Sequence, residues 1–275
     1  MTNYKIHKFP DSRIASIDVC DIGNRKHHVT GLVEFDVTES RRKIREYNRC
    51  RSNKISFNAW LISVISSTIK KYDVSGSYLI GKNKLIIFDD INVSIVVEKD
   101  LNGTKVPIPL IIERANAISI SSIARQITEA KNKEFTENDI VLQKKARRLE
   151  KVYYLLPGFL RRYFWKYLLK HPKLAYRKMG NVAFTSIGMM GKINGWFIPI
   201  SVHPICFGVG SIIKKPSVIN DVIEIREMLN MSVLLDHDVI DGAPMARFIS
   251  DLSANIENGL NISDTETIPG TPVGN

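Results

Sequence analysis

Apolar side chains recur at helical spacing in three stretches of the chain. Residues 56–71 carry them on the face that repeats every three or four positions, and residues 119–131 and 243–257 follow the same pattern. Residues 28–38 instead alternate between apolar and polar side chains, which predicts a half-exposed strand. Further short strands are predicted at residues 77–80, 85–88, 92–97, 105–111 and 233–235.

Length and composition indicate a folded domain with a core of its own. The chain has 275 residues, 44% of them hydrophobic, which is enough for one large domain or a compact domain with an insertion. No run of about 18 apolar residues occurs and the first residues lack a hydrophobic signal core, so we expect a cytoplasmic protein without membrane spans. The three cysteines lie far apart without C-x-x-C spacing, which argues against a disulfide framework or a zinc site.

The positive charge is concentrated in one segment. Residues 131–180 contain 14 of the 39 basic and 4 of the 28 acidic residues, which leaves 25 basic and 24 acidic residues elsewhere. The centre of this segment, VYYLLPGFLRRYFWKYLLKHP, mixes aromatic and basic residues. That composition suits a helix packed on its own domain with a solvated basic side, a docking surface for an acidic carrier protein, or a membrane interface. No recognition motif indicates nucleic acid.

The stretch MSVLLDHDVIDGAPMARF, residues 231–248, carries the clearest candidate chemistry. An apolar run leads into His237, a turn with Asp241 and Gly242 follows, and the helical pattern begins there. Histidine takes and returns a proton near neutral pH, and the carboxylate of Asp241 would orient the ring or brace the loop. The alternative is a hydrogen-bonded core histidine and an aspartate that only caps the helix.

Two further histidines, His27 and His28, stand next to each other at the start of a predicted strand. A metal pair is one interpretation, but no third ligand is near in sequence, and adjacent strand residues point to opposite faces. We therefore expect one ring to point inward and the other outward.

Residues 236–248, DHDVIDGAPMARF, resemble the D-H-R-x-x-D-G-A signature of the acyltransferase subunits of 2-oxoacid dehydrogenase complexes. They also resemble the H-x-x-x-D-G signature of chloramphenicol acetyltransferase, a family with the same fold. Asp238 stands where the first family usually has arginine. The resemblance covers residues 28–130 and 181–259 in order, and in it residues 196–200 and 204–210 match two consecutive strands.

The resemblance implies an architecture. The expected fold is α/β, an α+β two-layer sandwich: a chloramphenicol-acetyltransferase-like mixed β-sheet with helices packed on it. We expect a single domain over residues 1–262, a basic helical insertion at about residues 133–179, and a disordered tail at residues 263–275. Relatives form trimers with the active site between subunits, so we expect a homotrimer or a higher oligomer of trimers.

The resemblance also implies a mechanism. His237 would act as general base and Asp241 would hold the loop. Residues 182–191, VAFTSIGMMG, resemble an F-T-I-S-x-x-G stretch in which a hydroxyl three positions before the glycine hydrogen-bonds the oxyanion, and this count selects Thr185. Ser186 replaces it if the register shifts by one, and a threonine with only a structural hydrogen bond is the alternative. Coenzyme A or acyl-CoA would be the substrate, with no metal.

The acceptor is left open by the sequence. Dehydrogenase-complex subunits carry a lipoyl domain with a modified lysine, for which this chain has no counterpart, so we expect a stand-alone acyltransferase acting on a small molecule or a carrier-bound group. The use of lipoyl groups carried by another protein is the other possibility. A different class is a non-catalytic trimeric scaffold or binding module that docks partners through the basic insertion.

Overall fold

The computed structural model describes most of the chain, namely residues 2–7, 9, 12–101, 104–132, 152–187 and 194–262. Residues 133–151 of the predicted insertion and the predicted tail at residues 263–275 lie outside these ranges.

The helices begin and end close to where the apolar periodicity predicts them. The most buried helix, α3, starts after Ser56, whose hydroxyl accepts a hydrogen bond from Ala59 N at 3.2 Å and so caps the first turn. One helix near the N-terminus, α1, was not predicted. The described α-helices are α1 Ser12–Gly23, α2 Thr38–Cys50, α3 Phe57–Lys71, α4 Ile120–Asn132, α6 Gly158–Lys170, α7 Pro172–Met179 and α8 Gly242–Glu257.

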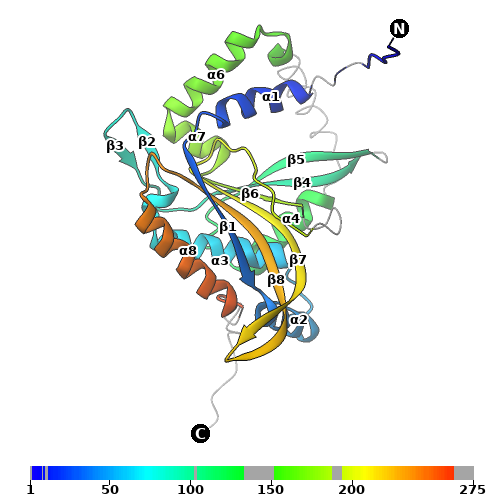
Figure 1. Cartoon of the computed structure of the whole chain (residues 1–275). Coiled ribbons are helices and arrows are strands. Elements are labelled where there is room, and N and C mark those ends of the chain that lie inside the picture. The colour runs from blue at the N-terminus through cyan, green and yellow to red at the C-terminus, as the bar shows by residue number, and fades with distance from the viewer. Residues whose placement is uncertain are drawn as a thin grey trace.

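A mixed six-stranded sheet in the order β1-β8-β7-β6-β4-β5 forms the centre of the molecule (Figure 1). Its strand β6 runs parallel to both of its neighbours, β4 and β7, and the other pairs are antiparallel. The strands are β1 His28–Asp36, β4 Val93–Leu101, β5 Thr104–Ile112, β6 Val182–Ser186, β7 Ile205–Ile219 and β8 Val222–Asp236. A separate hairpin pairs β2 Tyr78–Ile80 with β3 Lys84–Ile86.

The core lies between one face of this sheet and a layer of helices. Trp60 of α3 and Phe248 of α8 are buried against strand residues that include Phe35, Phe207 and Val233. Burial of such side chains contributes roughly 1.5–3 kcal/mol each relative to exposure. The predicted two-layer arrangement of a mixed sheet and packed helices is therefore confirmed.

Residues 196–200 cross the opposite face of the sheet and are not the strand that the sequence predicts. Ser232 Oγ of β8 donates to Phe197 O at 2.7 Å, so this segment is bound through a side chain. The backbone passes close above Gly208 of β7, where a Cβ would collide with Ser232 Oγ and lie 2.9 Å from Pro199 Cδ. We call residues 196–200 the strap.

The two long strands β7 and β8 form one hairpin, which the sequence did not predict as continuous. Its turn is made by Asn220 and Asp221, both in the left-handed region with φ of 49° and 64°. Consecutive residues of this type favour a two-residue hairpin turn. The hairpin carries the chain from the strap to the end of β8, where the predicted catalytic histidine follows.

At the other end of the sheet, α6 packs beside α1, and α7 contacts both α6 and β2 (Figure 1). The described part of the predicted insertion is thus helical. None of the helices in the described ranges combines the length and the hydropathy of a membrane-spanning helix.

Candidate active site

His237 directly follows β8 and is exposed. Its backbone N–H donates to His27 O at 2.9 Å, while the N–H groups of Val239 and Ile240 donate back to Asp236 O at 3.1 and 3.3 Å. Val239 and Ile240 are buried in the core, so the turn is anchored on both sides of the histidine. The fold therefore presents the His237 ring to the outside from a fixed backbone.

The buried carboxylate of Asp236 braces this turn from below. It is 1% exposed, its Oδ2 accepts from Lys26 Nζ at 2.6 Å and its Oδ1 accepts from Asp238 N at 3.2 Å. Because Lys26 is still 22% exposed, breaking this pair should cost less than the roughly 3–5 kcal/mol typical of a fully buried ion pair. Asp236 is not among the predicted site residues, although an acidic residue at the end of an apolar run is visible in the sequence.

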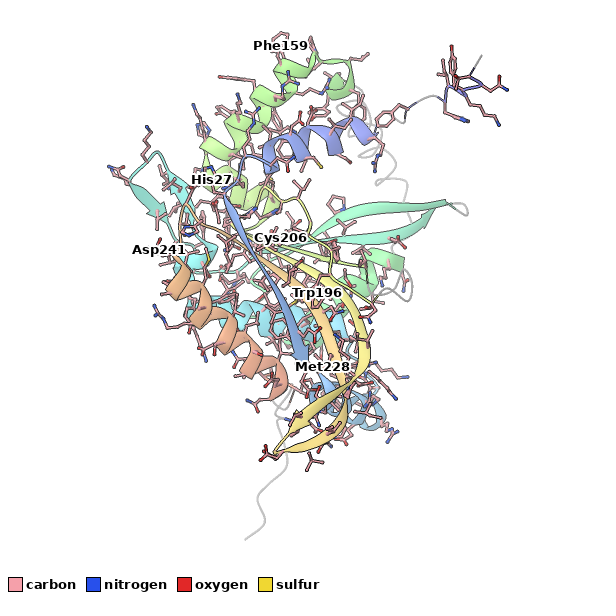
Figure 2. All side chains as sticks on the ribbon, viewed as in Figure 1. His27, Phe159, Trp196, Cys206, Met228 and Asp241 are labelled. Atoms are coloured by element: carbon pink, nitrogen blue, oxygen red, sulfur yellow. The ribbon has the colours of Figure 1, made fainter. Side chains whose placement is uncertain are left out.

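Asp241 occupies the N-cap position of α8 in extended conformation, and its side chain makes no capping hydrogen bond. It is exposed, and the described contacts include no hydrogen bond between its carboxylate and His237. Figure 2 shows Asp241 at the start of α8 and His27 at the start of β1. Asp236 braces the turn within this chain, and the role of Asp241 in holding the loop and the ring stays a prediction.

Thr185 lies in β6 and pairs in register with Gly208 of β7. Phe184 points into the core, so the alternation of side chains directs Thr185 to the opposite face and Ser186 to the core side. The half-buried Thr185 hydroxyl has no hydrogen-bond partner among the described contacts. Of the two hydroxyls that the sequence selects, Thr185 is therefore the one on the face away from the helices.

One chain does not bring Thr185 and His237 together. Thr185, Gly208 and Ser232 form one row across β6, β7 and β8, and His237 is five residues beyond Ser232 along β8. A strand rises about 3.3 Å per residue, which separates the two along the strand direction by roughly 17 Å. A hydrogen bond spans about 3 Å, so the two side chains cannot act on one atom within a single subunit.

The histidine pair at the start of β1 follows the expectation of one ring outward and one inward. His27 is exposed and its Nδ1 lies 2.9 Å from Asp238 Oδ1, a hydrogen bond that raises the pKa of His27. His28 is half-buried, its Nε2 donates to His203 O at 2.9 Å, and burial lowers its pKa. Within the described ranges, no cluster of three or more His, Cys, Asp and Glu side chains is arranged to hold a metal ion.

A comparison with protein families identifies the class of this fold and site. The model of the 2-oxoacid dehydrogenases acyltransferase (catalytic domain) family matches residues 23–141 and 169–263. These ranges include Thr185, His237 and Asp241 and cover more than half of the chain. The chain belongs to this family.

Curated relatives are acyltransferase components of dehydrogenase complexes. The dihydrolipoyllysine-residue acetyltransferase component of the pyruvate dehydrogenase complex of Mycoplasma genitalium is 26% identical over 215 residues, which are 77% of this chain and 46% of the relative. The chain spans about half the length of the curated relatives that it matches.

Solved structures share the fold. The cubic core of a pyruvate dehydrogenase multienzyme complex has a TM-score of 0.64 at 17% identity, covering 94% of each chain. The dihydrolipoamide acetyltransferase of Azotobacter vinelandii has a TM-score of 0.66 at 17% identity, also covering 94% of each chain. For that enzyme, crystallographic and enzymatic work addresses one serine, one histidine and one asparagine in the catalytic mechanism.

Proposed function

We propose that this chain is an acyltransferase that moves an acyl group between coenzyme A and an acceptor thiol or hydroxyl, with His237 as general base. The observation that carries the proposal is the exposed His237 on its braced turn, inside a region that matches the acyltransferase family. A scaffold or binding module, the competing prediction, has no use for such a histidine.

The spacing of the three candidate residues supports the assignment. In the Azotobacter vinelandii enzyme, the histidine follows the serine by 52 residues and the asparagine follows the histidine by four. Thr185, His237 and Asp241 have the same spacing in this chain. Threonine replaces serine, which keeps the hydroxyl, and aspartate replaces asparagine, which keeps a side-chain carbonyl oxygen.

The proposed reaction proceeds in two proton-coupled steps. An imidazole nitrogen of His237 takes the proton from the acceptor thiol or hydroxyl, whose sulfur or oxygen then attacks the carbonyl carbon of the acyl thioester. The Thr185 hydroxyl donates a hydrogen bond to the oxyanion of the tetrahedral intermediate. The carbon–sulfur bond to coenzyme A then breaks, and the leaving sulfur takes the proton back from His237. No covalent enzyme intermediate or metal is part of this scheme.

We propose that the site forms between two subunits of a homotrimer, with His237 from one and Thr185 from the next. The separation of these residues along the sheet supports this arrangement, because one chain alone leaves each without the other. The Thr185 hydroxyl also lies on the face away from the helices. The cubic core to which the fold is similar is a multienzyme assembly.

We further propose that residues 133–179 are an insertion into a single domain spanning residues 1–262. The family model leaves out residues 142–168 and resumes before β6, whose neighbour β4 precedes the gap. The preferred acceptors are a small molecule or a carrier-bound group, with lipoyl groups of another protein as the alternative. The cytoplasmic location stays a prediction.

The test is release of free thiol from acetyl-CoA and longer acyl-CoAs, with dihydrolipoamide and a panel of alcohols and amines as acceptors. We expect acceptor-dependent release that is lost in His237→Ala and retained in His171→Ala, which removes an exposed histidine elsewhere. Thr185→Ala should lower the rate by about 100- to 1000-fold, as loss of an oxyanion donor does, while Thr185→Ser retains most of it. Undiminished release by His237→Ala would overturn the mechanism.

A further inference from the structure

Helix α6 exposes a continuous row of apolar and aromatic side chains, which we call the α6 ridge. Its members are Phe159, Leu160, Tyr163, Phe164 and Tyr167, between 41% and 67% exposed. Positions separated by four residues lie on one face of a helix, so the five side chains form one stripe rather than scattered exposures. Figure 2 shows Phe159 on the outer side of α6, away from α1. Contiguous exposed apolar surface of this kind marks an interaction site.

The inner face of α6 already has its partners. Arg161 Nε donates to the buried Asp18 Oδ2 of α1 at 2.7 Å, and Tyr153 OH donates to the same oxygen at 2.7 Å. Trp165 Nε1 donates to Tyr153 OH at 3.0 Å, and Leu168 is buried. The helix is thus held to the domain by one face, and packing on its own domain does not explain the ridge on the other.

The charge around the ridge selects an anionic partner. Residues 158–179, which span α6 and α7, contain seven Lys and Arg residues and no Asp or Glu. The basic side chains stand among the apolar ones: Arg162 and Lys166 line a shallow groove together with Phe159, Leu160 and Tyr163. The long side chains of Lys and Arg keep their charge in water while their stems cover apolar surface.

We propose that the α6 ridge docks the protein on an anionic lipid membrane, with the helix lying in the plane of the interface. Phe, Leu and Tyr would enter the boundary between headgroups and acyl chains, and Lys166, Lys170 and Arg162 would contact lipid phosphates. An acidic soluble protein would supply negative charge to the basic residues, but its charged surface would leave the apolar side chains of the α6 ridge in water. Docking of this kind needs no membrane-spanning helix, and it does not depend on the proposed acyl transfer.

Sedimentation with lipid vesicles tests the charge requirement. The full chain should bind vesicles that contain about one third phosphatidylglycerol in phosphatidylcholine, and bind at least about tenfold less to phosphatidylcholine alone. Reversing two charges with Lys166→Glu and Lys170→Glu should lower binding to the anionic vesicles by about tenfold or more. The matched pair Lys82→Glu and Lys84→Glu, on the exposed β2–β3 hairpin, should leave binding within about twofold of wild type.

A second set of variants tests the apolar ridge. The triple variant Phe159→Ser, Tyr163→Ser and Phe164→Ser should lose most of the vesicle binding although it keeps every basic residue. The control Leu85→Ser with Ile87→Ser, which removes exposed apolar side chains from the β2–β3 hairpin, should bind as wild type does. The triple variant should keep the hydrogen-exchange protection of the buried helix α3, which shows that it folds whether or not the proposed acyl transfer holds.

Insertion is read out directly with Phe164→Trp. Relative to wild type, which has three tryptophans of its own, the variant should gain emission that shifts to shorter wavelength with anionic vesicles and is quenched by lipids brominated on their acyl chains. Binding without quenching would reduce the effect to surface adsorption and overturn the proposal. Three other results would also overturn the proposal. One is vesicle binding by the triple variant that equals that of wild type. Another is a change of oligomeric mass in the ridge variants while wild type binds no vesicles, and the third is ridge-dependent binding to an acidic acyl carrier protein but not to vesicles.

Discussion

A partly buried histidine, His203, connects the predicted insertion to the base of the candidate site. Its Nε2 donates to Met179 O at the end of α7 at 3.0 Å, and its Nδ1 lies 3.2 Å from Ser201 Oγ. Its backbone O accepts from His28 Nε2, at the start of β1. A neutral ring offers one donor and one acceptor, so this arrangement satisfies the neutral form.

The state of His203 predicts how stability depends on pH. Burial lowers the pKa of His203 to about 4, against 6.5 for the ordinary side chain. Between pH 6.5 and about 4 the unfolded chain therefore binds a proton that the folded chain does not. The free energy of unfolding should fall as the pH drops through this range, by up to about 1.4 kcal/mol per pH unit from this one residue. Above pH 6.5 the His203 ring is neutral in both the folded and the unfolded chain, so it no longer changes the free energy of unfolding with pH.

Urea unfolding at several pH values checks this prediction. His203→Gln keeps one donor and one acceptor but does not titrate, so its stability should vary less steeply between pH 6.5 and about 4 than that of wild type. His28, whose pKa is also lowered by burial, remains in the variant and retains its own slope of the same sign. His171→Gln, on an exposed ring, is the control. An equal slope in His203→Gln and wild type would contradict the prediction.

At the scale of elements, sequence periodicity predicted the positions of those helices whose burial depends on residues close in the chain. The apolar faces of α4 and α8 appear where the spacing places them, because each of these helices buries one stripe, whereas α3 is buried on almost all sides. The strap was predicted as a strand because residues 196–200 resemble a strand of the family, but β6 pairs directly with β7 and leaves no place for another strand between them. Its backbone bonds instead to the side chain of Ser232.

Site residues whose contact partners are distant in the chain could not be predicted from the sequence. His237 and Thr185 were selected by local motifs, whereas Asp236 was missed because its partner Lys26 lies 210 residues away. Helix α1 was missed in the same way. Its buried Asp18 accepts hydrogen bonds from Arg161 and Tyr153, which lie far away in the sequence. A local pattern identifies the reacting group more readily than the groups that hold it.

The contact between α1 and α6 carries a prediction of its own. Asp18→Asn removes the charge that pairs with Arg161 at 2.7 Å, in a contact where the two side chains are only 2% and 15% exposed. An uncompensated partly buried guanidinium should cost about 2–4 kcal/mol, discounted slightly from the fully buried case. Because α6 contacts the rest of the domain mainly through α1 and α7, we expect this loss as local release of α6.

Hydrogen exchange of the backbone amides measures that release. Amides of residues 158–170 should exchange faster in Asp18→Asn, while those of the buried helix α3 stay protected. Asp21→Asn changes an exposed carboxylate on the same helix and should leave both unchanged. Equal protection of α6 in the two variants would show that the Asp18 pair does not hold it.

On the scale of the whole molecule, the sheet separates the two candidate catalytic groups. His237 stands at the end of β8, and Thr185 lies in the row of Ser232, five residues back along the same strand. Under the proposed mechanism a monomer carries His237 and Thr185 at two separate places, and a neighbouring subunit would supply the missing group at each. A cyclic trimer would then have three complete sites, one at every junction between neighbouring subunits.

Mixing inactive subunits tests this arrangement. Subunits with His237→Ala keep Thr185, and subunits with Thr185→Ala keep His237, so each preparation alone should be inactive or nearly so. Co-expressed in equal amounts, about three quarters of the trimers are hybrids, and each hybrid has one junction with both groups intact among its three. The mixture should therefore recover about a quarter of wild-type thiol release. If His237 and Thr185 acted within one subunit, every subunit in the mixture would lack one group and no activity would return. Recovery well above the sum of the two parents can arise only from a site that two chains share.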